Sequence, residues 1–76
     1  MITVKLYGLL RLDSGIKELK LNALSVKEIF DHMTNKGFQM TDLNGCVILV
    51  NGAAASKRSK LKDGDVVQLL SPVAGG

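Results

Sequence analysis

The sequence has few of the residues that build disulfides, aromatic cores and stiff loops. Its 76 residues include one cysteine, one proline, no tryptophan and three other aromatic residues. An aromatic content of 4% implies an aliphatic core. The lone cysteine excludes an internal disulfide and favours a reducing compartment. The first residues show no long apolar run or small-residue cleavage site, and no segment approaches the length that crosses a bilayer. We therefore expect a cytoplasmic chain without membrane association.

Side chains at catalytic or metal-ligating spacing are also missing. His32 is the only histidine, and neither a second histidine nor a cysteine stands at ligand spacing from it. We expect His32 to be exposed on a helix, and Cys46, with no basic neighbour in sequence, to be a small core residue. Asp63 and Asp65 flank a turn glycine without a calcium-loop pattern, and the phosphate motifs GxGxxG and GxxxxGK[ST] do not occur. We therefore expect no catalytic residue, no metal site and no cofactor bound by the chain itself.

The composition and charge fit a packed domain. Hydrophobic residues make up 46% of the chain and charged residues 22%. We expect a single domain over residues 1–76 with a flexible C-terminal tail over residues 71–76. The net charge of +3 is concentrated in SKRSKLK, residues 56–62. Nucleic-acid binding needs interleaved aromatic side chains or a groove-reading motif, and neither is present. We expect a solvated loop and no nucleic-acid partner, with a basic RNA-binding domain left as an alternative.

The first half of the sequence predicts a hairpin. Residues 2–7 alternate between apolar and polar, with Ile2, Val4 and Leu6 on the face expected to be buried. A compact loop, LLRLDSG, is expected to lead into a second strand around residues 19–21. The two strands would pair across that loop.

A helix is predicted over about residues 25–36. Ser25 and Glu28 have the spacing of a capping box, and Gly37 can take the left-handed conformation that ends a helix. The apolar residues recur at the spacing of one helical face: Val26, Ile29, Phe30 and Met33.

The second half predicts three more strands. CVILV, residues 46–50, follows an expected loop, FQMTDLNG, and is interpreted as a strand covered on both faces or nearly so. Asn51–Gly52 is a hairpin signal before a brief edge strand at AAAS. KDGD, residues 62–65, is a tight turn before a last strand, residues 66–70. This order predicts a small α+β sheet with one main helix packed across one face.

The outer face of this sheet is a candidate binding surface. The last strand is expected to turn Val67 and Leu69 toward the helix and Leu70 toward the opposite face, beside Tyr7. An outward Tyr7 and Leu70 would leave an apolar area on a polar surface, which is typical of a partner-binding patch. Alternatively, loops cover both side chains, and the two interpretations stay open.

The segment SPVAGG offers the one remaining source of chemistry. Pro72 disfavours helix at Ser71, so we expect the six residues to be extended over roughly 20 Å. Gly75 and Gly76 carry no side chain, so their backbone can lie in a narrow channel of another protein. The group delivered there is the α-carboxylate of Gly76. It must be activated, usually as an acyl adenylate formed with ATP, before an amine, a thiol or sulfide can attack. A frayed chain end is the alternative interpretation.

Five segments resemble, in order and spacing, the MoaD/ThiS family of ubiquitin-like sulfur carriers, above all the small subunits of molybdopterin synthase. They are ITVKLYG, SVKEIF, VILVNG, LKDGDVV and LLSPVAGG. The resemblance covers nearly the whole chain, and PVAGG is its most specific part. It implies a β-grasp (ubiquitin-like) fold, a mixed sheet in which the first and last strands are parallel neighbours.

The resemblance also implies a reaction sequence. An E1-like adenylating enzyme (MoeB-like), using ATP and magnesium, would adenylate Gly76, and the adenylate would become a thiocarboxylate. The tail would then insert into a molybdopterin synthase large subunit (MoaE-like), and the sulfur would pass to a pterin precursor in molybdenum or tungsten cofactor biosynthesis. The chain itself would be a non-catalytic subunit. The inserted residues would be Pro72, Val73, Ala74, Gly75 and Gly76.

The tail departs from the family's usual pattern in one place. The family commonly has two prolines preceded by an aromatic pair, whereas Leu69, Leu70 and Ser71 precede the single Pro72 here. The acceptor of the sulfur therefore stays open. A carrier for thiamine thiazole or another acceptor, and a ubiquitin-like modifier that joins Gly76 to lysines, remain alternatives.

Overall fold

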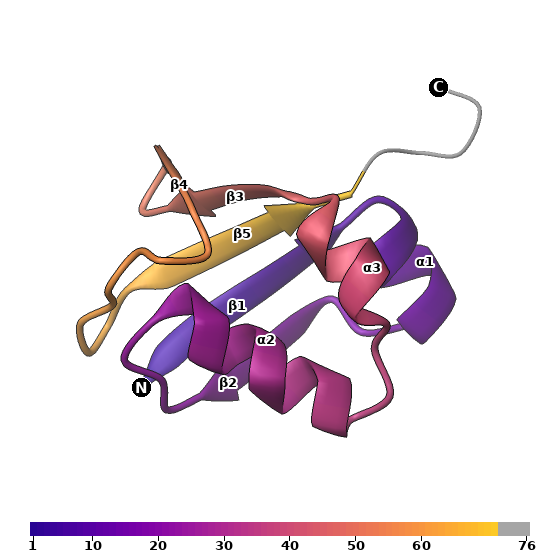
Figure 1. The fold of residues 1–76 in the computed structure, drawn as a ribbon, viewed down its shortest axis with the longest axis horizontal. Coiled ribbons are helices and arrows are strands. Elements are labelled where there is room, and N and C mark those ends of the chain that lie inside the picture. The colour runs from indigo at the N-terminus through magenta and orange to yellow at the C-terminus, as the bar shows by residue number, and fades with distance from the viewer. Residues whose placement is uncertain (72–76) are drawn as a thin grey trace.

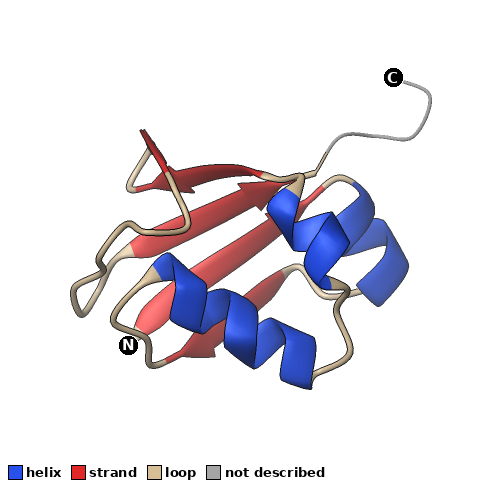
Figure 2. Cartoon of the chain, viewed as in Figure 1, coloured by secondary structure: helices blue, strands red, loops and turns tan. Residues whose placement is uncertain are grey.

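The computed structural model describes residues 1–71. A five-stranded sheet forms one layer, and α2 lies across one of its faces, with α1 and α3 near the end where β5 finishes (Figure 1 and Figure 2). The strands are β1 (Ile2–Tyr7), β2 (Glu18–Leu21), β3 (Val47–Val50), β4 (Ala53–Ala55) and β5 (Val66–Leu70). The helices are α1 (Leu9–Ser14), α2 (Val26–Asn35) and α3 (Met40–Asn44). The predicted α+β class and its main helix are confirmed.

The first and last strands are parallel neighbours inside the sheet. The strand order is β2-β1-β5-β3-β4, with β2 antiparallel to β1, and β3 antiparallel to both β5 and β4. The predicted mixed sheet is therefore confirmed. The register places Tyr7 opposite Leu70, so β1 and β5 finish at the same edge. The chain leaves the sheet beside the start of α1.

Apolar side chains from the sheet and α2 form the core. Val4 and Leu6 of β1, with Val67 and Leu69 of β5, are at most 1% exposed. The predicted stripe of α2 is buried as well: Val26, Ile29, Phe30 and Met33. Burying one large apolar side chain fully stabilises a fold by about 1.5–3 kcal/mol. Among residues 1–71 no polar or charged residue is buried in this core. Contacts between apolar side chains therefore stabilise the core.

Both ends of α2 follow the predicted capping pattern, except that the Glu28 side chain has a different partner. The Ser25 hydroxyl accepts a hydrogen bond from the Glu28 amide at 3.3 Å, and the helix begins at Val26. The Glu28 carboxylate reaches the Leu24 amide at 3.3 Å, one residue earlier than a capping box requires. Gly37 has a φ of 105°, which a residue with a side chain rarely adopts.

The predicted loop between β1 and β2 is wrong, because Leu9–Ser14 form α1. This helix buries Leu10, which is 4% exposed. Gly8, at its N-cap, provides no side-chain hydrogen bond. The Leu10 amide is bonded instead to the hydroxyl of Ser71, 61 residues later in the chain. A local sequence pattern carries no sign of such a distant cap.

Two further predictions are corrected before and within β3. The loop expected there contains α3, a short helix that buries Leu43. Propensity alone does not hold so short a helix, so the burial of Leu43 stabilises it. β3 is not covered on both faces, because Val47 is 57% exposed while Ile48 packs against the core. A continuous apolar run does not show which of its faces is exposed.

The two turns that precede β4 and β5 are tied together by side chains. The β3–β4 hairpin turns at Asn51 and Gly52, as predicted, with φ of 51° and 84°. The Asn51 side chain donates to the Asp65 carboxylate and accepts from the Val66 amide, both at 2.9 Å. The Lys62 amide also donates to Asp65, at 2.8 Å. These hydrogen bonds hold the pKa of Asp65 below its usual value, with the larger effect from the Lys62 amide and the next from the Asn51 side chain.

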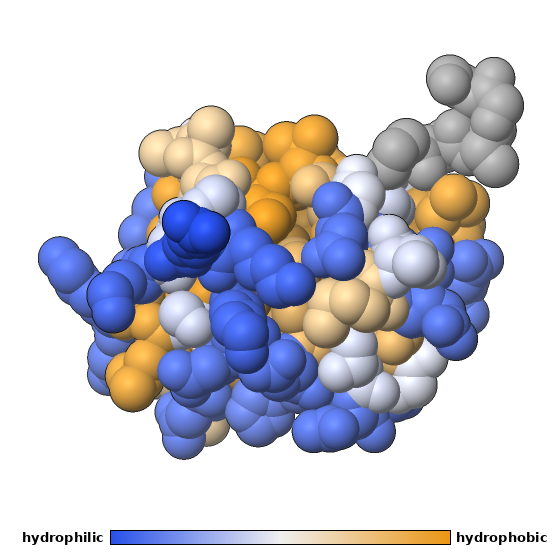
Figure 3. Space-filling model, viewed as in Figure 1, coloured by the Kyte–Doolittle hydropathy of each residue, from blue (hydrophilic) through white to orange (hydrophobic). Residues whose placement is uncertain are grey.

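Polar and hydrophobic residues are distributed unevenly over the surface. Polar residues cover much of the face that carries α2, while hydrophobic residues gather over β3 and β4 (Figure 3). Over residues 1–71, no helix combines the length and apolar character needed to cross a membrane.

Candidate functional site

Ser71, the first residue of the predicted tail, is the last described residue of the chain. It is half-buried directly after β5. Its hydroxyl donates to the Tyr7 carbonyl at 3.1 Å and accepts from the Leu10 amide at 3.0 Å. The other predicted tail residues lie outside the described residues: Pro72, Val73, Ala74, Gly75 and Gly76. The candidate site is therefore built around the point where the tail begins.

An apolar patch lies beside this point, on the sheet face opposite α2. Tyr7 and Leu70 face each other in register, and Val47 pairs with Leu70 on its other side. The Gln68 side chain donates to the Tyr7 hydroxyl at 3.2 Å, so Gln68 lies on the same face. Leu49 is the register partner of Gln68 and shares that face. We call Tyr7, Val47, Leu49 and Leu70 the outer patch.

The outer patch is accessible to a partner. Val47 is 57% exposed, and Tyr7, Leu49 and Leu70 are half-buried. The outward placement of Tyr7 and Leu70 agrees with the prediction, and no loop within residues 1–71 buries them fully. Contiguous exposed apolar surface of this kind marks interaction sites in soluble domains. Partner binding by Tyr7 and Leu70 stays a prediction.

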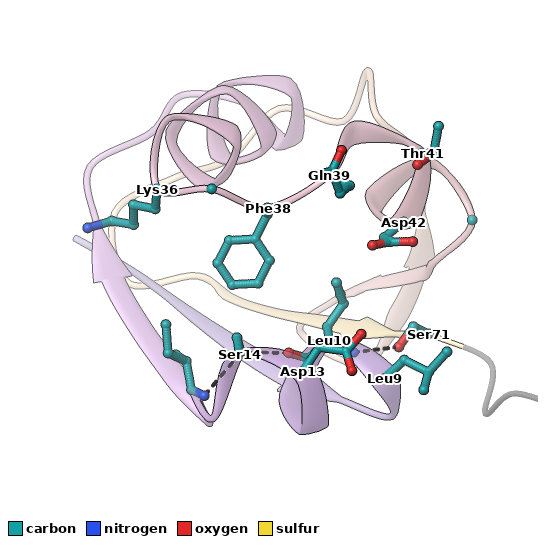
Figure 4. A pocket seen from close by; sticks show the side chains of 13 residues that line it. Leu9, Leu10, Asp13, Ser14, Lys36, Phe38, Gln39, Thr41, Asp42 and Ser71 are labelled. Carbon is teal, nitrogen blue, oxygen red and sulfur yellow. Dashed lines mark hydrogen bonds between the residues drawn. The ribbon is translucent and has the colours of Figure 1, made fainter.

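A groove opens on the helical side of the same corner. It has a volume of about 560 Å³ and lies between α1 and the segment that joins α2 to α3, with Ser71 in its wall (Figure 4). Leu10 and Phe38 point into it, and Asp13 and Asp42 bring carboxylates to it. No histidine or cysteine lines it. Sequence reasoning missed the groove because both helices in its walls were interpreted as loops.

The Cys46 thiol is not activated. Cys46 is half-buried and packs against the core, and its thiol donates to the Asp42 carbonyl at 3.2 Å. Burial, reinforced by the charge of Asp42, raises the pKa of the Cys46 thiol to about 11. The thiol is therefore protonated at neutral pH, and the prediction of an inert packed cysteine is confirmed. His32 is exposed on α2, as predicted. Over residues 1–71, no three histidine, cysteine or acidic side chains are grouped to hold a metal ion.

The basic segment, residues 56–62, is a loop with exposed cations, as predicted, and it also packs on the start of α2. The Val26 amide donates to the Ser59 carbonyl at 3.0 Å. The Lys57 ammonium lies 6.0 Å from the centroid of the buried Phe30 ring, within reach of a cation–π interaction. The segment therefore helps to satisfy the amino end of α2. Its exposed cations are Arg58, Lys60 and Lys62.

Comparisons with known proteins agree over nearly the whole chain. The model of the ThiS family matches residues 4–76. A chain in the complex of subunits 1 and 2 of molybdopterin-converting factor from Helicobacter pylori is 29% identical, with a TM-score of 0.73 and 99% of this chain and 97% of that chain covered. The small archaeal modifier protein SAMP1 from Methanosarcina acetivorans is 28% identical, with a TM-score of 0.77 and coverage of 99% and 95%. A chain in the BexX/CysO complex from Amycolatopsis orientalis is 25% identical, with a TM-score of 0.71 and both chains covered completely. A search of curated proteins gave no match.

These similarities bear on the fold and on the general role. The structural neighbours share the β-grasp arrangement, so the predicted β-grasp fold is confirmed. Two of the three structures described above are complexes with a second protein. In this chain, the outer patch and the start of the tail lie at one corner of the sheet.

Proposed function

The chain belongs to the ThiS family of ubiquitin-like sulfur carriers, and we propose that it is the small subunit of a molybdopterin synthase that carries sulfur as a thiocarboxylate on Gly76. The observation that carries the proposal is the family match, which runs through the Gly75–Gly76 pair. The 29% identity to a chain of a molybdopterin-converting factor complex supports a pterin acceptor. The raised pKa of the Cys46 thiol is consistent with chemistry carried by the tail.

The proposed chemistry conserves every atom of the carrier except one oxygen. A carboxylate oxygen of Gly76 attacks the α-phosphorus of ATP held with magnesium by an E1-like adenylating enzyme, and pyrophosphate leaves. A sulfide equivalent from a sulfur donor then attacks the acyl carbon, forming a C–S bond as AMP leaves. The thiocarboxylate sulfur next attacks an electrophilic carbon of the acceptor, forming a C–S bond as an oxygen leaving group departs from that carbon. Water finally attacks the acyl carbon, releasing the sulfur on the acceptor and restoring the carboxylate.

The body of the chain contributes docking and delivery. The outer patch would hold the chain on each partner, while the five residues after Ser71 reach about 17 Å when extended. The glycine backbone suits a narrow channel because it has no Cβ. Tethering keeps the sulfur at a high effective concentration beside the acceptor and prevents its loss to solvent. We place this ATP-dependent sequence in the cytoplasm.

The test is the intact mass of the protein after incubation with ATP, magnesium, a sulfur donor and the host's E1-like adenylating enzyme. We expect replacement of one oxygen by sulfur, located at Gly76 by fragmentation. A variant that ends at Gly75 is the matched control, because it keeps the folded body and removes only Gly76, the residue proposed to carry the sulfur. An unchanged mass, with an enzyme that is active on another ThiS-family carrier, would contradict the carrier proposal.

A second incubation identifies the acceptor. The thiocarboxylated protein is mixed with a molybdopterin synthase large subunit (MoaE-like) and the pterin precursor, or with a thiazole-forming enzyme and its substrate. We expect sulfur to appear in the pterin product and Gly76 to regain its oxygen. Sulfur transfer only to the thiazole would keep the carrier and replace the acceptor.

A protein modifier is the second candidate function, favoured by the 28% identity to a small archaeal modifier protein. Its adenylate would accept a lysine amine instead of sulfide, giving an isopeptide bond at Gly76. Mass spectrometry of cellular peptides that keep the glycine remnant on lysine would detect it. Such conjugates, with no thiocarboxylate formed in the first test, would favour the modifier.

A further inference from the structure

We propose that Ser71 is a positioning residue that anchors the start of the tail to the corner between β1 and α1 and so sets the direction in which the tail leaves the sheet. This inference rests on the proposed function, in which the tail delivers Gly76 to a partner. The contacts of Ser71 that support it lie within residues 1–71. The reaction that the anchor would affect is attack of the Gly76 carboxylate on the α-phosphorus of ATP, with pyrophosphate leaving.

The Ser71 hydroxyl joins three elements at one point. It donates to the carbonyl of Tyr7, the last residue of β1, at 3.1 Å, and accepts from the Leu10 amide in the first turn of α1 at 3.0 Å. The hydroxyl thus uses its O–H as a donor and one of its two lone pairs as an acceptor. Gly8, the N-cap of α1, provides no side-chain cap of its own. Ser71 therefore acts as the cap of a helix that begins 62 positions earlier than itself, at Leu9.

Gly8 is in close backbone contact with Ser71. A Cβ placed on Gly8 would collide with the Ser71 backbone carbonyl oxygen and touch its hydroxyl at 3.0 Å. The φ of Gly8 is +67°, which also disfavours any side chain. The backbone of Ser71 thus lies directly on the backbone of Gly8. The joint is fixed by the two hydrogen bonds of the hydroxyl, by a longer one from the Ser71 amide to the Tyr7 carbonyl at 3.5 Å, and by close backbone contact.

The anchor ties the tail to the outer patch. Tyr7 and Leu70 belong to the patch, and Ser71 follows Leu70 while bonding to Tyr7. A partner that docks on the patch therefore meets Ser71, the start of the tail, at a constant place. Because Ser71 precedes a proline, its own backbone is also restricted to extended conformations. Losing the hydroxyl would remove the link to α1 and leave only the longer bond from the Ser71 amide to Tyr7, which would loosen the angle at which the tail leaves the sheet without removing any patch side chain.

The rate of adenylation depends on this angle, because it depends on how often the Gly76 carboxylate reaches ATP in the reactive geometry. Misplacing reacting groups by about 1 Å can lower a rate about a hundredfold. Docking affinity depends on the patch and is unaffected by the angle. The anchor should therefore change kcat for adenylation and leave KM nearly constant.

The kinetic test compares adenylation of Ser71→Ala, Ser71→Thr and Ser14→Ala by the E1-like enzyme, with ATP saturating and the carrier varied. Ser14→Ala is the matched control, because Ser14 also makes two hydrogen bonds at α1, to the Leu10 carbonyl and the Ile16 amide. We expect kcat to fall about tenfold or more in Ser71→Ala, with KM within about twofold. Ser71→Thr keeps a hydroxyl, and we expect it to stay within about twofold of the original chain.

A second readout does not need the partner. We expect ¹⁵N relaxation of the Val73 and Ala74 amides to show lower order parameters in Ser71→Ala than in the original chain, but no change in Ser14→Ala. Gly8→Ala, which pushes on the Ser71 carbonyl, is expected to act like Ser71→Ala. Equal relaxation in all variants, or an equal loss of kcat in Ser14→Ala, would overturn the positioning role. A chain that is never adenylated would instead contradict the proposed function, and the relaxation result would still decide the anchor.

Discussion

Tyr7 and Leu70 lie opposite each other in register where β1 and β5 end side by side. Strands from the two ends of the sequence thereby build one apolar surface. Ser71 follows Leu70 and bonds to the Tyr7 carbonyl, so the surface and the start of the tail form a single corner. A partner that binds the surface is therefore held at a fixed distance from the start of the tail.

Leu70→Asp is expected to weaken binding to both the adenylating enzyme and the synthase large subunit by about thirtyfold or more. A charge in the middle of an apolar interface removes a contact and must lose its hydration when the interface forms. Isothermal titration calorimetry measures both dissociation constants. Leu24→Asp is the matched control, since Leu24 is 72% exposed and precedes α2, outside the patch. Equal affinities for the two variants would show that the outer patch is not the interface.

The elements found from sequence were those whose signals are local. The alternation of β1, the capping pair Ser25 and Glu28, and the Asn51–Gly52 turn each lie within a few residues of what they specify. The parallel pairing of β1 with β5 came instead from the resemblance to a family, because no local pattern names a strand's partner. The outward Tyr7 followed from simple alternation.

The elements missed from sequence depend on distant contacts. α1 is capped by Ser71, and α3 is held by the buried side chain of Leu43. Neither helix is long enough to show a full apolar period. The groove between them was missed for the same reason. The apolar run of β3 gave no sign that Val47 would be exposed, because its two faces have similar composition.

Extending the chain beyond Gly76 by one residue that has a side chain is expected to abolish thiocarboxylate formation, because the terminal carboxylate then belongs to that residue and no longer to Gly76. The extension changes no residue of the core, so we expect the thermal midpoint to stay within about 3 °C. Intact mass and thermal denaturation measure the two effects. Proteolytic removal of the extension is the control and should restore activity. Sulfur transfer by a chain that keeps its extension would argue against Gly76 as the carrier residue.

Asp65→Asn is expected to lower the free energy of unfolding at pH 7, because the hydrogen bonds from Lys62 and Asn51 favour the ionised carboxylate. The pKa of Asp65 lies below its usual value in the folded chain. Its contribution is therefore present above the unfolded pKa of about 3.9 and is lost as the pH falls through the folded value. Urea midpoints from pH 7 to pH 2.5 should show the gap between the two proteins closing at low pH. Asp13→Asn, at the groove, is the control, and a gap that widens on acidification would contradict the assignment.

Cys46→Ala is expected to leave the rate of thiocarboxylate formation within about twofold, because sulfur is proposed to reside on Gly76. The Cys46 thiol, with a pKa raised to about 11, has almost no thiolate at neutral pH. Its alkylation by iodoacetamide at pH 7.5 should be about two orders of magnitude slower than in urea, where the thiol regains a pKa near about 8.5. The folded rate should then climb as the pH approaches 11. Rapid alkylation of the folded chain at pH 7.5, together with lost sulfur transfer in Cys46→Ala, would move the sulfur-carrying role from the tail to this side chain.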